Sequence, residues 1–309
     1  MKTILFIKKI FYIKGKLLLN IILIFMTVFY ILIIDKTNSK DLQKQICTSN
    51  ETTDRKYQFM KDNNISYYEL SKYLKFSTFD ISLYYEYENA RTLYNFTYLQ
   101  ALNFVNYPNY YTPYQNSKYS LFTNSTLILT NKSFYLSKYY VPSNLVSLNN
   151  YKIQYIIRPN ENMKARKIVL DNFSLMYEKA KSEGIELIIY SAYRSFEKQE
   201  DLYYNINNCN DQYSAKPGYS EHQTGYCLDI SDSFHGLSLN LAYSNTYKWL
   251  IENSYKYGFI LRYPKGKEEY TKYNYEPWHF RYVGVKDSYI ITNNNLCLEE
   301  YLFNNFELK

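Results

Sequence analysis

The feature that most constrains this chain is a pair of histidines placed beside carboxylates in two distant stretches. His222 and Asp229 lie in SEHQTGYCLDI, residues 220–230, and Gly225 between them lets the backbone turn from a loop into a strand. His279 ends a second short stretch, EPWH. The chain has three histidines, and two of them belong to this constellation. Histidine nitrogens and carboxylate oxygens bind zinc, and a catalytic zinc keeps one position open for water.

We interpret His222, Asp229 and His279 as three ligands in a mononuclear zinc hydrolase site. Each has a plainer explanation when taken alone, because a histidine beside a tryptophan is often packed or exposed, and Asp229 would serve to cap a turn. The three together, with Glu276 three residues before His279, favour the metal site. A glutamate in this place reaches the attacking water without binding the metal. We therefore predict that Glu276 is the catalytic base.

Four blocks of sequence resemble the D-alanyl-D-alanine and L,D-carboxypeptidase family of bacterial zinc peptidases, which trim peptidoglycan stem peptides. The blocks are SAYRSFEKQ (191–199), SEHQTGYCLDI (220–230), GFILRYPKGKEEYTKYNYEPWHFRYVG (258–284) and LEEYL (298–302). The resemblance extends from about residue 185 to residue 301. It implies one bound Zn²⁺, held by the three ligands named above, and the role of base for Glu276.

Arg194 is the candidate for recognising the substrate's end. An exopeptidase must bind a free carboxylate, and the planar guanidinium of arginine does so with two parallel hydrogen bonds. The resemblance implies that Arg194 holds the terminal carboxylate, with help from Gln199 and Ser220. The alternative for Arg194 is a structural salt bridge. A glutamine on a helix surface and a serine in a turn are also commonplace, so Gln199 and Ser220 have plainer explanations too.

The N-terminal part of the chain differs from the rest in charge and hydropathy. Five of the 36 basic residues precede residue 17, and the first acidic residue is Asp35. Without these five lysines, 31 basic residues face 29 acidic ones, and no basic stripe suited to nucleic acid remains. Residues 17–34 are mostly apolar and contain one polar amide, at Asn20, and their length is near the lower limit for a membrane-spanning helix.

We predict that residues 17–34 form an uncleaved transmembrane anchor. The preceding lysines would stay in the cytoplasm by the positive-inside rule, which places the rest of the chain outside. A cleavable signal peptide is the competing interpretation, but its apolar region is normally shorter, and the sequence after Ile33 is a poor cleavage site. The expected location is the cell membrane, with a single span and the catalytic domain on the cell-wall side.

The pattern along the chain predicts five segments. They are a basic cytoplasmic segment (1–16), the anchor (17–34), a polar juxtamembrane linker (35–64), a leader region with at least one helix (65–134) and the zinc carboxypeptidase domain (135–309). Within the last segment, periodicity predicts helices at 163–182, 196–206 and 245–257. Strands are predicted at 185–190, 226–230, 259–262 and 278–283.

The four cysteines are too widely spaced to resemble a disulfide framework. They are Cys47, Cys209, Cys227 and Cys297. Cys227 stands two residues before Asp229, on the same face if this stretch is a strand. The resembling family usually has a small residue such as alanine there, so we expect a small buried side chain near the site.

The order of these elements predicts an α+β fold, with a small, mostly antiparallel sheet backed by helices, the zinc site on the sheet face, and a transmembrane helix before it. The predicted function is that of a membrane-anchored zinc D,D-carboxypeptidase that removes the C-terminal D-alanine from peptidoglycan stem peptides. The alternatives are an L,D-carboxypeptidase acting on tetrapeptide stems and a zinc-retaining wall-binding domain without activity. The expected partners are the stem peptide and the membrane, without nucleic acid or an obligate protein partner.

Overall fold

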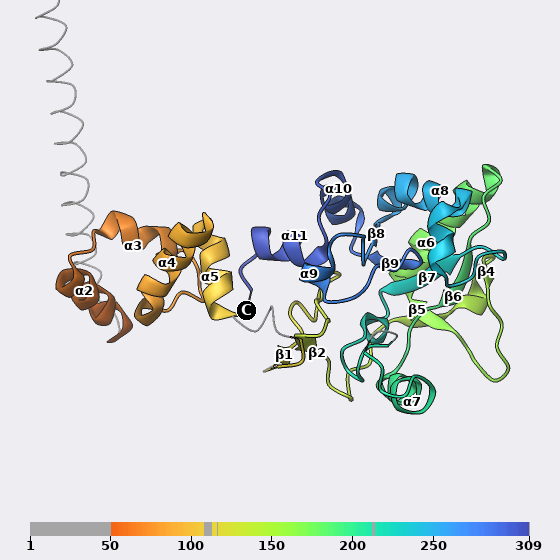
Figure 1. The fold of residues 1–309 in the computed structure, drawn as a ribbon, viewed down its shortest axis with the longest axis horizontal. Helices are drawn as coiled ribbons and strands as arrows, with labels where there is room; N and C mark the ends of the chain where they lie inside the picture. The colour runs from red at the N-terminus through yellow and green to blue at the C-terminus, as the bar shows by residue number, and fades with distance from the viewer. Residues whose placement is uncertain (1–50, 108–112, 116, 212–213, 309) are drawn as a thin grey trace, which may run out of the picture. The chain divides into compact units, whose positions relative to one another are not determined.

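The computed structural model describes residues 51–107, 113–115, 117–211 and 214–308 (Figure 1). The chain divides into two compact units, Met1–Tyr98 and Leu99–Lys309. The predicted five-segment division stays a prediction, and its first two segments, 1–16 and 17–34, lie outside the described residues.

The first unit is helical in its described part. Its helices are α2 (Glu51–Asn63), α3 (Tyr67–Leu74), α4 (Tyr84–Tyr94) and the start of α5 (Tyr98–Asn106). The sequence explains the start of α3, because Ser66 and Glu69 form a capping box that pairs two free backbone N–H groups. Leu70, Tyr73 and Tyr87 are fully buried, which gives this unit a small aromatic core of its own. Helix α2 falls within the segment predicted to be a linker, and α3 to α5 bear out the predicted helix.

The second unit alternates short strands with helices (Figure 1). Its strands are β1 (Lys118–Tyr119), β2 (Phe134–Tyr135), β3 (Leu145–Ser147), β4 (Gln154–Tyr155), β5 (Lys164–Arg166), β6 (Ile188–Ser191), β7 (Cys227–Ser231), β8 (Phe259–Leu261) and β9 (His279–Tyr282). Its helices after α5 are α6 (Lys167–Ser182), α7 (Phe196–Asp201), α8 (Asn245–Asn253), α9 (Glu268–Thr271), α10 (Val285–Asn293) and α11 (Leu298–Asn305).

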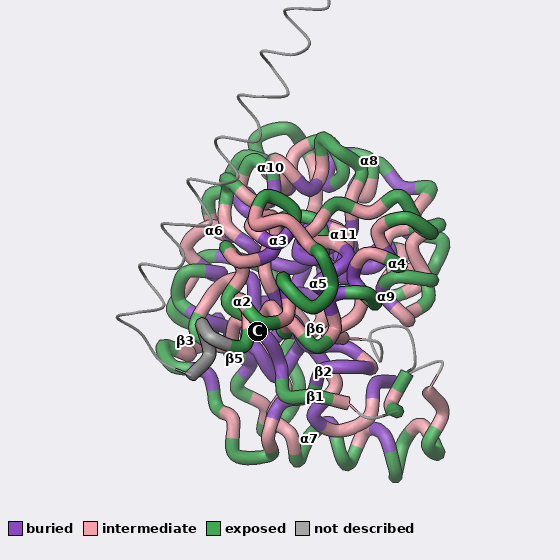
Figure 2. Tube along the Cα trace, turned by 90° about the vertical axis from the view of Figure 1, so that its left-hand side faces the viewer, coloured by how far each residue is buried: buried purple, intermediate pink, exposed green. Residues whose placement is uncertain are grey.

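Five strands form the main sheet in the order β4-β6-β7-β9-β8. The β4–β6 pair is parallel and the other three pairs are antiparallel. The predicted α+β fold with a mostly antiparallel sheet is therefore confirmed. Two smaller pairs, β1–β2 and β3–β5, lie outside this sheet. Every residue of β7 and β9 is buried, and buried stretches are purple in Figure 2.

The two central strands divide their side chains between an apolar and a polar face. Successive side chains of a strand point to opposite faces. Leu228 and Ile230 of β7, together with Phe280 of β9, pack in the apolar core with the buried side of α6, which contributes Val169, Leu170, Phe173 and Met176. The alternating residues of the same strands therefore face the other side of the sheet. These include Asp229 and His279, so helix packing on one face fixes the polar site on the other.

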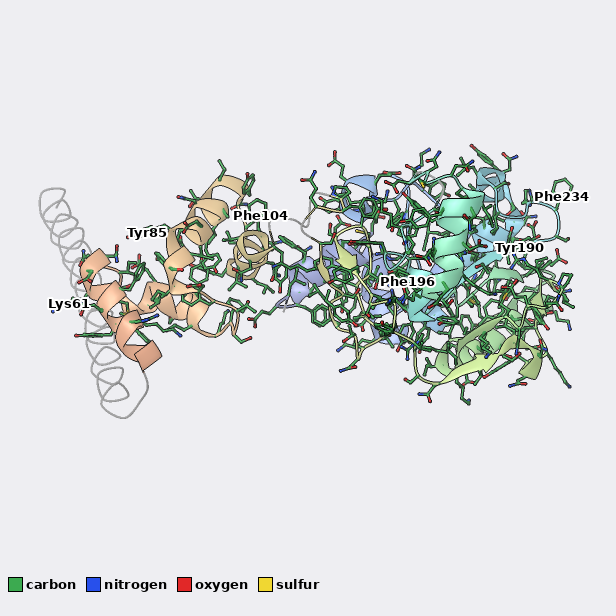
Figure 3. All side chains as sticks on the ribbon, turned by 90° about the horizontal axis from the view of Figure 1, so that it is seen from below. Lys61, Tyr85, Phe104, Tyr190, Phe196 and Phe234 are labelled. Atoms are coloured by element: carbon green, nitrogen blue, oxygen red, sulfur yellow. The ribbon has the colours of Figure 1, made fainter. Side chains whose placement is uncertain are left out.

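Most helices and strands lie where periodicity predicts them. Helix α6 begins at Lys167, four residues later than predicted, because residues 164–166 form β5 against β3. The predicted helix at 196–206 is α7, which begins at Phe196 (Figure 3), followed by a π-helical turn over Leu202–Ile206. Ser195 caps this helix by accepting a hydrogen bond from the backbone N–H of Lys198.

One part of the predicted fold class is wrong. We predicted a transmembrane helix before the α+β domain, but in the part of the chain that the structure describes no helix is long and apolar enough to cross a membrane. The longest described helix, α6, has 16 residues, and a spanning helix needs about 20 apolar residues. The predicted segment itself, residues 17–34, lies outside the described residues.

Candidate active site

Strand pairing brings together two of the three predicted ligands. Asp229 of β7 and His279 of β9 lie directly opposite each other in the antiparallel register. Side chains at such a position share one face of the sheet, with their Cβ atoms about 5 Å apart. The two residues are 50 positions apart in the chain, and the register alone makes them neighbours.

His222 reaches the same place from a short 3₁₀ turn, Glu221–Thr224. Gly225 ends this turn with a φ of +71°, in the left-handed region that favours glycine. A Cβ at this position would lie 3.1 Å from Leu145 Cδ2 and 3.2 Å from Arg166 Cγ, so the space is closed as well. The glycine inferred from the sequence therefore serves both the turn and the close packing that carries the chain from His222 into β7.

The three candidate ligands fit a zinc ion. His222 Nε2 lies 3.3 Å from Asp229 Oδ2, and His279 Nδ1 lies 3.2 Å from Asp229 Oδ1. Ligand atoms on a tetrahedral zinc, each about 2.1 Å from the metal, are roughly 3.4 Å apart. Asp229 Oδ1 is buried and accepts no hydrogen bond from the described residues. The set of two imidazoles and one carboxylate, close together in a buried site, matches the donors that zinc prefers.

Hydrogen bonding orients His222 for this role. Its Nδ1 lies 2.6 Å from the carbonyl oxygen of Ala192 and donates to it, which leaves the Nε2 lone pair directed at Asp229. Burial lowers the pKa of His222, which favours the neutral imidazole, the form that binds a metal. Burial alone would raise the pKa of Asp229, but the neighbouring His222 and His279 hold it below its ordinary value. The carboxylate is therefore ionised.

Glu276 lies beside His279 but is not one of the three clustered candidate ligands. Its Oε2 is 3.4 Å from His279 Nδ1. A tight turn brings the side chains of Glu276 and His279 together. In this turn the backbone N–H of His279 donates to the carbonyl oxygen of Glu276, and Pro277 between them is buried. Burial raises the pKa of the Glu276 carboxyl to about 7. A carboxylate with a pKa near neutrality is suited to taking up and returning a proton.

The residues predicted to bind the substrate's terminal carboxylate have different surroundings. Arg194 is partly buried, donates to Gln199 Oε1 at 2.8 Å and to Ser191 Oγ at 3.1 Å, and forms no salt bridge with a described residue. Gln199 is buried, and its Nε2 donates to Ser214 Oγ and to the carbonyl oxygen of Ala215. The contacts of Gln199 thus orient Arg194. A direct contact between Gln199 and the substrate stays a prediction.

A single cavity of about 360 Å³ connects these groups. The three candidate ligands, Glu276, Arg194 and Ser220 all line it, whereas Gln199 does not. The structure therefore brings together six of the seven predicted site residues. The seventh, Gln199, is hydrogen-bonded to Arg194.

Sequence reasoning missed a buried charged network behind His279. Glu221 Oε1 accepts hydrogen bonds from Arg262 Nε and Arg281 Nη1, each at 2.7 Å. Arg262 also donates two hydrogen bonds to Glu299 in α11, at 2.6 and 2.7 Å. All four side chains are fully buried. One member of the network could have been suspected from the sequence, because Glu221 stands next to His222 in the stretch 220–230.

Cys227 is buried between this network and the ligands. Its Sγ donates to Glu221 Oε2 at 3.2 Å, and one ligand-type atom of each of Cys227, Glu221 and His279 lies within 4.8 Å of the others. The expected small buried side chain near the site is thus found. Cys209, Cys227 and Cys297 are free thiols, and Cys47 lies outside the described residues.

Comparison with known proteins finds relatives of this chain. The family model VanY, D-alanyl-D-alanine carboxypeptidase, matches residues 162–285. YodJ of Bacillus subtilis (strain 168) is 43% identical over 183 residues, which are 57% of this chain and 66% of that protein. The bifunctional D-Ala-D-Ala dipeptidase and D-Ala-D-Ala carboxypeptidase VanXYC of Enterococcus gallinarum is 31% identical over 188 residues, 57% of this chain and 93% of that protein.

A solved structure shares the fold. The LdcB LD-carboxypeptidase, whose structure reveals the molecular basis of peptidoglycan recognition, is 39% identical with a TM-score of 0.52, over 57% of this chain and 85% of that one. The chain spans between 51% and 66% of the length of three curated relatives it matches. With nearly the full length of the Enterococcus gallinarum protein matched at 31% identity, the chain belongs to the VanY D-alanyl-D-alanine carboxypeptidase family.

Proposed function

We propose that this chain is a zinc-dependent D,D-carboxypeptidase that removes the C-terminal D-alanine from peptidoglycan stem peptides. One observation carries the proposal: the ligand group, Glu276 and Arg194 line the same cavity. A metallocarboxypeptidase needs a metal, a base and a cation for the free carboxylate, all within the length of one residue. Family membership supports the same activity. Because this substrate belongs to the cell wall, the catalytic domain is proposed to act on the wall side of the membrane.

Each group has a distinct task in this proposal. His222, Asp229 and His279 would hold a zinc ion, which would supply Lewis acidity to the scissile carbonyl and to the attacking water. Glu276 takes a proton from that water and returns it to the amine of the departing D-alanine. Arg194 binds the terminal carboxylate and so sets which peptide bond faces Glu276. A wall-binding domain without activity would have no use for a base with a raised pKa beside the metal ligands.

An L,D-carboxypeptidase is the second candidate, and the likeness to the LdcB LD-carboxypeptidase favours it. The two activities differ in the residue before the cleaved bond, which is D-alanine in a pentapeptide stem and the L-centre of a diamino acid in a tetrapeptide stem. The deciding experiment offers both peptides side by side and measures D-alanine release. The proposal expects a higher kcat/KM for the peptide that ends in D-Ala-D-Ala, and a preference for the tetrapeptide would establish the second candidate instead.

Replacing His222, Asp229 or His279 by alanine is expected to lower bound zinc strongly in each case. Three protein ligands leave none to spare, and the open fourth position belongs to water or substrate. Metal analysis of the purified variants measures the zinc content per chain. His235, which pairs with Asp232 away from the cavity, supplies the matched control, and His235→Ala should keep its zinc. Full zinc occupancy in His279→Ala would show that the ligand set is wrong.

Arg194→Ala is expected to raise KM by about 10- to 100-fold, because a charge-assisted hydrogen bond to a carboxylate is lost in both the ground and transition states. The penalty should shrink for a peptide with an amidated C-terminus, which offers Arg194 no carboxylate. Wild-type protein should correspondingly reject the amide. Steady-state kinetics on the free-acid and amidated peptides measure both effects. Equal cleavage of the two peptides by wild-type protein would indicate an endopeptidase and remove the role given to Arg194.

A further inference from the structure

A second cation faces the cavity from a segment that precedes the family match. Lys132 lines the same cavity as Arg194 and Glu276, but it lies outside residues 162–285. It occupies a tight turn in which the backbone groups of Asn131 and Phe134 form two hydrogen bonds. The Asn131 side chain accepts from the Ser133 N–H within this turn. Lys132 is thus held at a fixed place beside the site.

The turn is anchored to the buried charged network. Asn131 Nδ2 donates to Glu299 Oε1 at 3.0 Å, in a buried contact. Glu299 is in turn held by Arg262. The network that supports His279 from behind therefore also positions the turn that carries Lys132. A side chain that merely covers a surface would not need such support.

Aromatic rings fix the direction of the Lys132 side chain. Its Nζ lies 4.8 Å from the centre of the Tyr273 ring. The Tyr273 ring contacts Tyr263, and the Tyr263 ring contacts His279, with 4.8 Å between centroids in both pairs. Tyr273 and Tyr263 also line the cavity. The ammonium group thus stands on the same wall as the metal ligands, two rings away from His279.

The ammonium group of Lys132 has no carboxylate partner within 4.0 Å among the described residues. Among the described residues, its hydrogen-bond acceptor is the carbonyl oxygen of Asp211, at 3.3 Å. The Asp211 carboxylate is engaged elsewhere, since it accepts from Tyr203 at 2.7 Å and faces Lys216 at 4.0 Å. Burial lowers the pKa of Lys132, and the charges of Asp211 and Glu276 oppose this effect. A partly buried cation whose described carboxylate neighbours all lie beyond 4.0 Å gains a direct partner from an anionic ligand.

We propose that Lys132 is a specificity residue that binds a second carboxylate of the substrate, on a residue before the cleaved bond, while Arg194 binds the terminal one. This inference rests on the proposed function. Stem peptides offer such a carboxylate from two sources, the α-carboxyl of a γ-linked D-glutamate and the side-chain carboxyl of a diaminopimelate. In both cases, amidation removes the charge and leaves the rest of the peptide unchanged.

The test uses three synthetic pentapeptide stems ending in D-Ala-D-Ala: the free acid, the form amidated at D-glutamate and the form amidated at diaminopimelate. Kinetics and calorimetric binding are measured for wild-type protein, Lys132→Met and Lys132→Arg. Lys138→Met is the matched control, because Lys138 is exposed, lies in the same segment and does not line the cavity. Wild-type protein and Lys138→Met should show a KM about 10-fold or more lower for the free acid than for one of the amides.

Lys132→Met should lose this preference by weakening binding of the free acid alone, and Lys132→Arg should keep most of it. The amide that wild-type protein disfavours identifies which carboxylate is bound. Equal treatment of all three peptides by wild-type protein would overturn the proposal, as would an equal loss on all three in Lys132→Met, which is the sign of a structural role. Preferential binding of the free acid without any D-alanine release would support the Lys132 contact and contradict the proposed hydrolysis.

Discussion

Glu276→Gln is expected to lower kcat by about 10²- to 10⁴-fold while zinc stays bound, which is the usual contribution of a general base. The substitution keeps the size and shape of the side chain but removes its ability to take up a proton. Glu276 lines the cavity 3.4 Å from His279 Nδ1 but is not one of the three proposed ligands. Its replacement by glutamine should therefore leave the metal ligands in place. Steady-state kinetics on a D-Ala-D-Ala peptide, together with metal analysis, measure both quantities.

The matched control for this experiment is Glu269→Gln. Glu269 lies in α9, is exposed and does not line the cavity. This variant should keep wild-type kcat and zinc content. Wild-type kcat in Glu276→Gln would exclude Glu276 as the base. Loss of zinc from Glu276→Gln would instead make Glu276 a ligand, contrary to the set of two histidines and one aspartate.

Arg262→Met is expected to lower the free energy of unfolding by about 3–5 kcal/mol, the usual cost of removing one partner from a buried salt bridge. Arg262 is fully buried and pairs with both Glu221 and Glu299, so its loss leaves Glu299 without its arginine partner and Glu221 paired with Arg281 alone. A typical domain has only about 5–15 kcal/mol of stability, which makes this a large fraction. Urea unfolding, followed by tryptophan fluorescence, measures the change.

Lys167→Met is the control for this prediction. It removes a surface ion pair with Asp171 whose side chains are 62% and 42% exposed, and such pairs contribute about 0–1 kcal/mol. Arg262→Met should therefore be several times more destabilising than Lys167→Met. Equal effects of the two substitutions would show that the buried network does not stabilise the fold.

The positions of Asp229 and His279 on the sheet could be predicted because each depends on a short pattern in the neighbouring sequence. Alternation along residues 226–230 and 278–283 predicts two strands, and it places Asp229 and His279 on faces opposite to Leu228 and Phe280. Gly225 marks the turn that precedes the first of these strands. Only the pairing register, which makes Asp229 and His279 direct neighbours, had to come from the structure.

The supporting network was not predictable because its contacts are long-range. Glu221 meets Arg262 and Arg281 across 41 and 60 residues, and Asn131 meets Glu299 across 168. A single arginine or asparagine carries no periodic signal that names its partner. Lys132 shows the same difficulty, since a lysine in a short turn is ordinarily exposed. Lys132 reaches the cavity because its turn packs against Glu299 and its side chain lies over Tyr273.

Zinc-dependent hydrolysis is measured by the release of D-alanine from a synthetic pentapeptide stem before chelation, after chelation and after zinc is returned. We expect one D-alanine to be released per peptide, release to be lost when the metal is removed, and release to recover when zinc is added. Absence of D-alanine release under every metal condition, or release that persists in chelator at the original rate, would contradict zinc-dependent hydrolysis.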